Sequence, residues 1–153
     1  MILLEGKAIA QEIQAGLKER IESSKRVPRL AIVMVGSDPV SSKFVSLKEK
    51  FAREIGVETR RYELEENITA SQLRAHMKDI VHEARNDGVI IQLPLPTHID
   101  VQSILNTVMP AHDVDALSAR AVGDFQVGKE KVMPPVAAAI DILFDKYGIE
   151  VEG

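Results

Sequence analysis

Two short runs of wholly apolar residues constrain the fold of this chain most strongly. Residues 30–35 read LAIVMV and end at Gly36, and residues 89–91 read VII directly after the turn-forming pair Asp87-Gly88. Continuous apolar runs of this length, without alternation, are typical of strands that are buried on both faces of a parallel sheet. The chain must therefore supply helices to cover both faces.

Amphipathic segments stand between these runs. Apolar side chains recur every four positions in residues 9–21, and a second segment begins at Asp38-Pro39, a capping residue followed by a residue suited to the first turn. A third begins with the capping box Thr69 and Gln72. With a weaker strand at residues 57–64, the order predicts an α/β, three-layer domain with a mostly parallel sheet flanked by helices.

The last third of the chain predicts two more helices. Asp100 is expected to cap a short helix through residues 104–105, and residues 134–147 form a last helix that Gly148 ends. A length of 153 residues fits a single domain.

Composition excludes several classes of protein. A net charge of −4 without a basic cluster argues against nucleic acid as a partner, and the chain has no cysteine for a disulfide or thiolate site. The four histidines lack ligand spacing, so no metal site is expected. No apolar run approaches the ~20 residues of a membrane span, so we expect a cytoplasmic protein with no membrane association.

Lys48 and Phe44 are four residues apart on the second predicted helix and share a face with Leu47 and Phe51. A desolvated lysine has a lowered pKa and can act as a general acid/base near neutral pH. The alternative is a lysine whose stem covers the edge of an apolar stripe while its ammonium group stays in water.

Gln92 opens the loop Gln-Leu-Pro-Leu-Pro (residues 92–96) where the strand at 89–91 ends. The two prolines stiffen this loop, and ligands of α/β sheets bind beyond the carboxyl ends of the strands. Gln92 is therefore a candidate for a rigidly aimed amide; a proline-rich turn without function is the alternative.

Asp113 and Asp115 are two residues apart. In an extended chain their side chains point in opposite directions, so we expect one to face a pocket and the other solvent. An inward carboxylate can accept two N–H groups from the edge of a heterocycle. A surface turn or a helix cap is the alternative reading.

The order of these motifs resembles the bifunctional methylenetetrahydrofolate dehydrogenase/methenyltetrahydrofolate cyclohydrolase family over the whole chain. The matching segments are EGKAIA at residues 5–10, VGSDPVSS at 35–42 followed by Phe44-Val45 and Lys48, GVIIQLPLP at 88–96, and DVD at 113–115.

The resemblance implies an enzyme of one-carbon metabolism that interconverts methylene-, methenyl- and formyl-tetrahydrofolate. It implies Lys48 as the catalytic general acid/base, with Gln92 as the residue that tunes it. Asp115 would hold the pterin ring, Phe44 would stack on the substrate, and Leu93 and Pro94 would line its site.

The family also implies features that lie outside these residues. Residues 1–153 correspond to its folate-binding catalytic domain, and its nicotinamide-binding Rossmann-like domain is absent from this chain. NADP or NAD is therefore expected only with that second domain, and a G-x-G-x-x-G or Walker loop is not found in the sequence. The resemblance further implies a homodimer that binds a reduced folate.

The chain departs from the family pattern at several places. Phe44 replaces a tyrosine, Ala116 a glycine and Ala121 an asparagine, and residues 134–137 read PPVA where Pro-Cys-Thr-Pro is usual. Two further hypotheses follow. One is a catalytically degenerate module of the same fold that binds folate or forms dimers, and the other is a generic α/β domain in which the lysine and glutamine are structural.

Overall fold

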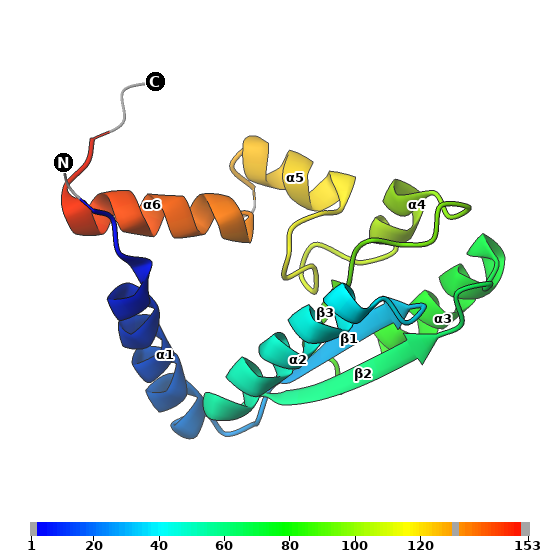
Figure 1. Cartoon of the computed structure of the whole chain (residues 1–153), viewed down its shortest axis with the longest axis horizontal. Helices are drawn as coiled ribbons and strands as arrows, with labels where there is room; N and C mark the ends of the chain where they lie inside the picture. Colours follow the sequence, from blue (N-terminus) through cyan, green and yellow to red (C-terminus); the bar gives the residue numbers. More distant parts are fainter. Residues whose placement is uncertain (1–2, 130–131, 151–153) are drawn as a thin grey trace.

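A parallel sheet of three strands forms the centre of the molecule. The computed structural model describes residues 3–129 and 132–150 (Figure 1). The strands are β1 (Arg29–Val35), β2 (Glu58–Leu64) and β3 (Gly88–Ile91), and they lie in the order β2-β1-β3. Both pairings are parallel, with Leu30 opposite Thr59 on one side and Gly88 on the other. The predicted parallel α/β sheet is confirmed.

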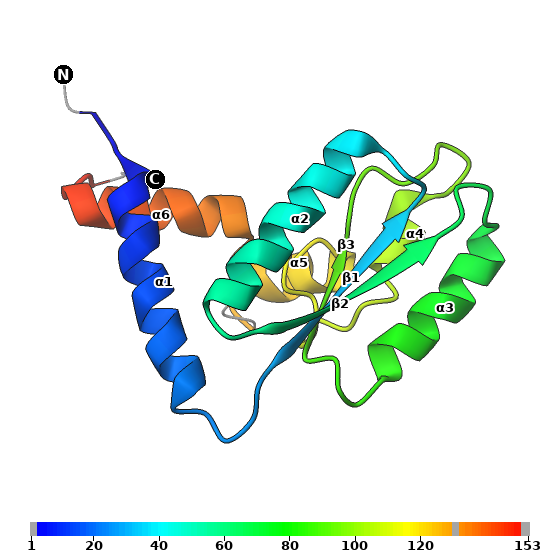
Figure 2. The same cartoon turned by 60° about the horizontal axis from the view of Figure 1, so that its bottom comes forward.

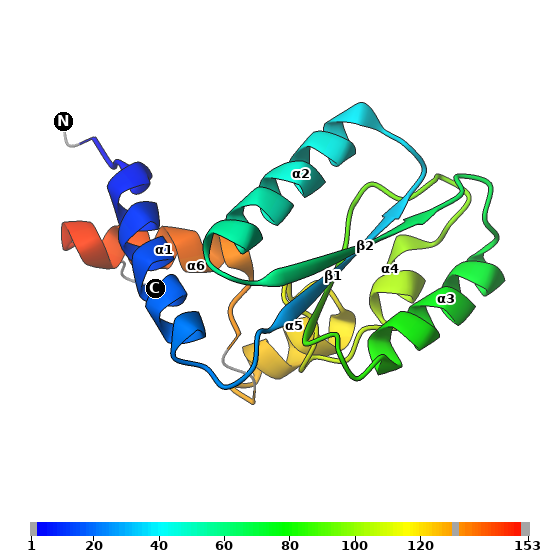
Figure 3. The same ribbon diagram turned by 90° about the horizontal axis from the view of Figure 1, so that it is seen from below.

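Helices cover both faces of the sheet. Helix α2 (Pro39–Glu54) lies on one face, and α3 (Ala70–His82) and the short α4 (Val101–Leu105) lie on the other (Figures 2 and 3). The larger core forms on the α3 side, where Leu73, Met77 and Ile104 are fully buried. This arrangement confirms the predicted three layers and leaves the loops beyond β1 and β3 free to form a site.

The face of α2 that packs on the sheet differs from the expected one. Its buried residues are Ser41, Val45 and Ala52, whereas Phe44 and Phe51 are 55% and 40% exposed. Val45 on the inner face packs with Ile32, Met34 and Ile90 of the sheet, and the aromatic residues are turned outward. The apolar stripe on this helix is therefore a surface feature.

Helices α1 (Gly6–Glu22) and α6 (Pro135–Tyr147) lie together to one side of the sheet (Figure 1). The Glu5 N–H donates to the Tyr147 hydroxyl at 2.9 Å, and Lys146 forms an ion pair with Glu12 at 2.7 Å. Gly148 ends α6 in the left-handed conformation, as predicted.

The sequence did not indicate helix α5 (Ala119–Gln126), which lies between α4 and α6 along the chain. Ser118 caps it by accepting the Ala121 N–H at 3.1 Å. Within the described residues, no helix is both long and apolar enough to cross a bilayer.

Candidate functional site

A lysine and a glutamine meet beyond the carboxyl end of the sheet. Lys48 Nζ, half-buried on α2, donates to Gln92 Oε1 at 3.2 Å. Gln92 follows β3 directly, and its backbone N–H donates to the Val33 carbonyl at 2.8 Å. Its Nε2 donates to the Leu93 carbonyl at 2.7 Å, which leaves Oε1 as the atom that faces the lysine. The structure thus brings together Lys48 and Gln92, the two predicted catalytic residues.

Asp115 is close enough to Lys48 for their charges to interact. Burial raises the pKa of the Asp115 carboxyl; the positive charge of Lys48 opposes that shift, and the negative charge of Asp113 adds to it. Lys48 and Asp115 line the same groove, so a ligand seated in the groove can contact both. The arrangement offers one proton-transfer group and one acceptor for N–H donors.

The groove has a volume of about 1050 Å³ and is otherwise mostly apolar. Its walls come from α1, α2 and α6, from the start of β1, from β3 and from the 114–115 segment. The apolar residues in this lining are Leu17, Pro28, Leu30, Leu47, Phe51, Ala52, Ile55, Val57, Ile90, Val114 and Pro135. A groove of this kind suits a flat, largely apolar ligand whose polar edge meets a few fixed groups.

Phe44 and Pro94 lie outside the lining of this groove. Phe44 is one turn before Lys48 on α2 and more than half exposed, so its ring is free to stack on a ligand that extends past the lysine. Pro94 is also exposed, follows a cis peptide bond after Leu93, and lines a separate hollow of about 550 Å³ beside Gly36 and Asp38. Leu93 is half-buried and contributes its carbonyl to Gln92.

The expectation for the two acids is wrong in one respect. Asp113 does not face solvent: it is 7% exposed and accepts the N–H groups of Leu117 at 3.3 Å and Ser118 at 2.8 Å. Alternation fails because the chain is not extended here; it turns at Ala116, whose φ is +51°. Sequence reasoning therefore missed Asp113 as a structural anchor.

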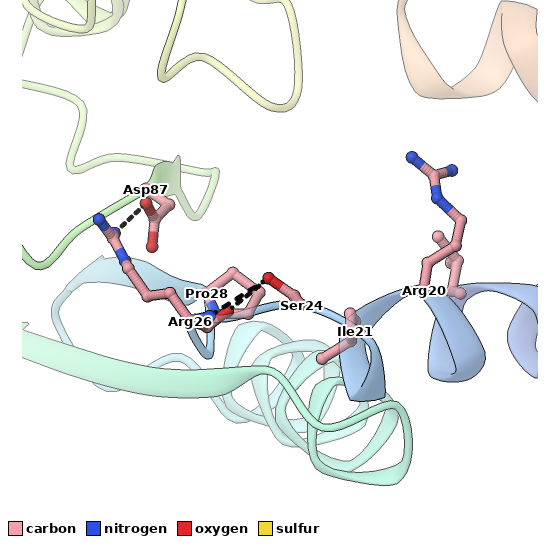
Figure 4. Close-up of a pocket in the computed structure, with 7 residues that line it drawn as sticks. Arg20, Ile21, Ser24, Arg26, Pro28 and Asp87 are labelled. Atoms are coloured by element: carbon pink, nitrogen blue, oxygen red, sulfur yellow. Dashed lines mark hydrogen bonds and ion pairs between the residues drawn. The ribbon is translucent and has the colours of Figure 1, made fainter.

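A further hollow of about 460 Å³ lies at the end of α1 (Figure 4). Arg26 forms an ion pair there with Asp87, and Arg20 points away from that pair (Figure 4). The two arginines therefore do not converge on a common ligand position. Among residues 3–129 and 132–150, the acidic and histidine side chains form no group of three that could hold a metal ion.

Comparison with known proteins identifies relatives along the whole chain. A family model described as tetrahydrofolate dehydrogenase/cyclohydrolase, catalytic domain, matches residues 4–115. Two curated relatives are named bifunctional protein FolD. The protein from a Nitratiruptor species is 32% identical over all of this chain and 56% of its own length, and that from Wolinella succinogenes is 36% identical over all of this chain and 55% of its own.

Solved structures agree with this result. The bifunctional FolD enzyme from Campylobacter jejuni superimposes with a TM-score of 0.93 at 34% identity, covering 100% of this chain and 56% of that one. A Trypanosoma brucei methylenetetrahydrofolate dehydrogenase-cyclohydrolase, complexed with NADP cofactor and inhibitor, gives 0.89 at 29% identity, covering 99% and 54%. The chain spans about half the length of the curated relatives it matches.

Proposed function

Since the chain belongs to the tetrahydrofolate dehydrogenase/cyclohydrolase family, we propose that its groove binds a reduced folate and that its site interconverts methylene-, methenyl- and formyl-tetrahydrofolate. The observation that carries the proposal is the hydrogen bond from Lys48 Nζ to Gln92 Oε1, with Asp115 in the same groove. A lysine at hydrogen-bond distance from a neutral amide, in a groove that also holds a carboxylate, is placed to act as a general acid/base on a bound ligand.

Lys48 would move protons in the hydrolysis of the methenyl bridge. Neutral Lys48 accepts a proton from water as its oxygen adds to the bridge carbon. The resulting ammonium then returns that proton to the ring nitrogen as the carbon–nitrogen bond breaks, while the new hydroxyl loses its own proton to solvent and becomes the formyl oxygen. Gln92 holds Nζ in place through both transfers, and the exposed Phe44 ring provides a stacking surface.

Asp115 would orient the substrate. A pterin ring presents adjacent N–H donors at one edge, and a carboxylate accepts two such groups in a fixed geometry. The apolar walls of the groove exclude water from these contacts and strengthen them.

Hydride transfer is not assigned to these residues. A nicotinamide dinucleotide is held through its phosphates by a glycine-rich turn at a helix start, and the sequence contains no G-x-G-x-x-G segment. The residues therefore do not fit this cofactor, and we propose that NADP or NAD would be bound by a separate domain. A homodimeric state remains a prediction of the family resemblance, and a cytoplasmic location remains a prediction from the apolar pattern of the sequence.

A second candidate function is a folate-binding or dimer-forming module that has lost the chemistry. The observation in its favour is Phe44, which lacks the phenol hydroxyl of the usual tyrosine, together with the PPVA sequence at residues 134–137. The two candidates differ in whether substitution of Lys48 changes turnover.

The test is the hydrolysis of methenyltetrahydrofolate, followed by loss of its absorbance, in the longest natural form of the protein. We expect Lys48→Ala to lower the rate by at least about a hundredfold, the lower range for loss of a general acid/base. Lys50→Ala is the matched control, because Lys50 lies exposed on the same helix and forms an i,i+4 ion pair with Glu54. Folate binding without turnover in the unmodified protein would favour the second candidate.

A further inference from the structure

Asp115 stands on a segment that is fixed at both of its ends. Before it, the Val89 N–H donates to the His112 carbonyl at 2.8 Å, and Asp113 forms a parallel bridge with Val89 beside β3. After it, Ser118 is 1% exposed and caps α5. The position of the Asp115 carboxylate therefore depends on how residues 112–118 are held against the sheet.

The Asp113 side chain joins these two ends. Its two carboxylate oxygens accept from the Leu117 and Ser118 N–H groups, and its backbone carbonyl accepts from the Ala116 N–H at 3.2 Å. The carboxylate thus closes the turn that contains Asp115, and it is buried against the protein instead of facing a ligand.

Gly88 allows the same turn to pack closely against β3. A Cβ atom placed on Gly88 would lie 2.6 Å from Val114 Cγ1 and 3.3 Å from Leu30 Cδ1, so Val114 sits where a side chain at position 88 would be. Gly88 does not have a positive φ, so its backbone conformation does not itself require glycine. Because of the close approach of Val114, a larger residue at position 88 requires Val114 to shift.

We propose that Asp113 and Gly88 are positioning residues that aim the Asp115 carboxylate into the groove beside Lys48. The proposal rests on the function proposed above only in taking a folate as the ligand that Asp115 meets. Neither residue need touch the substrate. Gly88 allows Val114 to pack against the strand, and Asp113 closes the turn. Together they hold the Asp115 side chain in one orientation.

The test pairs a substitution that creates a steric clash with a second substitution that removes it. Gly88→Ala introduces the methyl group that meets Val114 Cγ1, and adding Val114→Ala removes that Cγ1 atom while leaving Val114 Cβ 3.9 Å away, an ordinary contact. We expect Gly88→Ala to raise the KM for methenyltetrahydrofolate on the order of tenfold, as for a weakened hydrogen bond to a charged group, with kcat within about twofold. The double variant should return KM to the value of Val114→Ala alone.

A second readout does not depend on turnover. The Asp115 carboxyl can be titrated by carbon-13 NMR in the same proteins. Because burial raises the pKa of Asp115, displacement of the segment should move that pKa toward its ordinary value in Gly88→Ala, and the double variant should restore it. Both variants keep Asp113, so a change in pKa reports position and not the loss of a neighbouring charge.

Asp113→Asn is the independent variant, since it preserves volume but replaces one accepting oxygen with a donor. It should raise KM as Gly88→Ala does. Asp100→Ala is its control, because Asp100 caps α4 through Ser103 N–H and should cost stability without changing KM.

The inference is overturned if Gly88→Ala leaves both the pKa of Asp115 and KM at their unmodified values, or if the double variant restores neither. A fall in kcat at constant KM also overturns it. Failure of the proposed function looks different: Lys48→Ala would then leave turnover unchanged, while the NMR titration would still report the position of Asp115.

Discussion

The contact between Lys48 and Gln92 makes a quantitative prediction for Gln92→Glu. The substitution places a carboxylate at the position of an amide oxygen that is 3.2 Å from Nζ. Two unit charges at that separation attract by about 1 kcal/mol at the dielectric constant of water and by about 5 kcal/mol at an effective value near 20. Since Lys48 is half-buried, we take about 1–2 kcal/mol as the added stabilisation of its ammonium form.

That free energy lowers the neutral fraction of Lys48 about 5- to 30-fold at neutral pH. The kcat for methenyl hydrolysis should fall by the same factor, because the first step needs the neutral amine. KM should change by less than about threefold, since Asp115 and Phe44 are untouched. The deficit should shrink as pH rises, because the neutral amine is recovered.

The assay is the pH dependence of methenyl hydrolysis in the unmodified protein and in Gln92→Glu, with Gln11→Glu on the exposed face of α1 as the control for added charge. A kcat within twofold of the unmodified value at neutral pH would show that the charge state of Lys48 does not limit the reaction. A loss that is independent of pH would point to distorted geometry instead.

Three other substitutions separate binding from stability. Burial raises the pKa of Asp115, so its ionised form costs folding free energy at neutral pH. Asp115→Asn should therefore raise the melting temperature near pH ~7. The gain should vanish below the ordinary Asp pKa of about 4, where the carboxyl is protonated in both the folded and the unfolded state, and thermal denaturation at the two pH values checks this. The same variant should raise KM at least about tenfold through the lost charged acceptor. Phe44→Ala should raise KM roughly two- to tenfold by removing a stacking ring, with a melting temperature close to the unmodified one because the ring is 55% exposed. Thr69→Ala breaks the capping box of α3 and should cost about 1 kcal/mol in chemical denaturation while leaving KM unchanged; a changed KM would contradict the separation of that helix from the site.

The strands and most of the helices could be predicted because their signals are local. Residues 30–35 and 89–91 are apolar on both sides and form strands buried on both faces. Asp38, Thr69 and Asp100 cap the helices that they were expected to cap. Helix α5 was missed because it is only eight residues long, with Ala121 as its one buried residue.

The orientation of α2 could not be read from its own sequence. An apolar stripe predicts burial, but the buried residues of this helix are the smaller Ser41, Val45 and Ala52. Which face of a helix packs inward depends on how closely the helix approaches the strands, and that is a tertiary property. On the outward face, Leu47 and Phe51 line the groove.

The site residues were predicted mainly by family resemblance. Lys48 and Gln92 are 44 positions apart, and no local pattern indicates that their side chains meet at 3.2 Å. Asp113 was misjudged because the alternation argument assumes an extended chain, whereas the segment turns at Ala116. The role of Gly88 depends on a contact with Val114 that only the folded structure reveals.

Lys48→Arg separates proton transfer by Lys48 from the effect of its positive charge. Arginine keeps the positive charge and can donate to Gln92 Oε1, but it does not lose its proton in the range where enzymes work. Methenyl hydrolysis should therefore fall in Lys48→Arg by at least about a hundredfold, as it does in Lys48→Ala, while reduced folate still binds. An arginine variant that retains most of the unmodified rate would contradict the account, because a fixed positive charge would then be sufficient for catalysis.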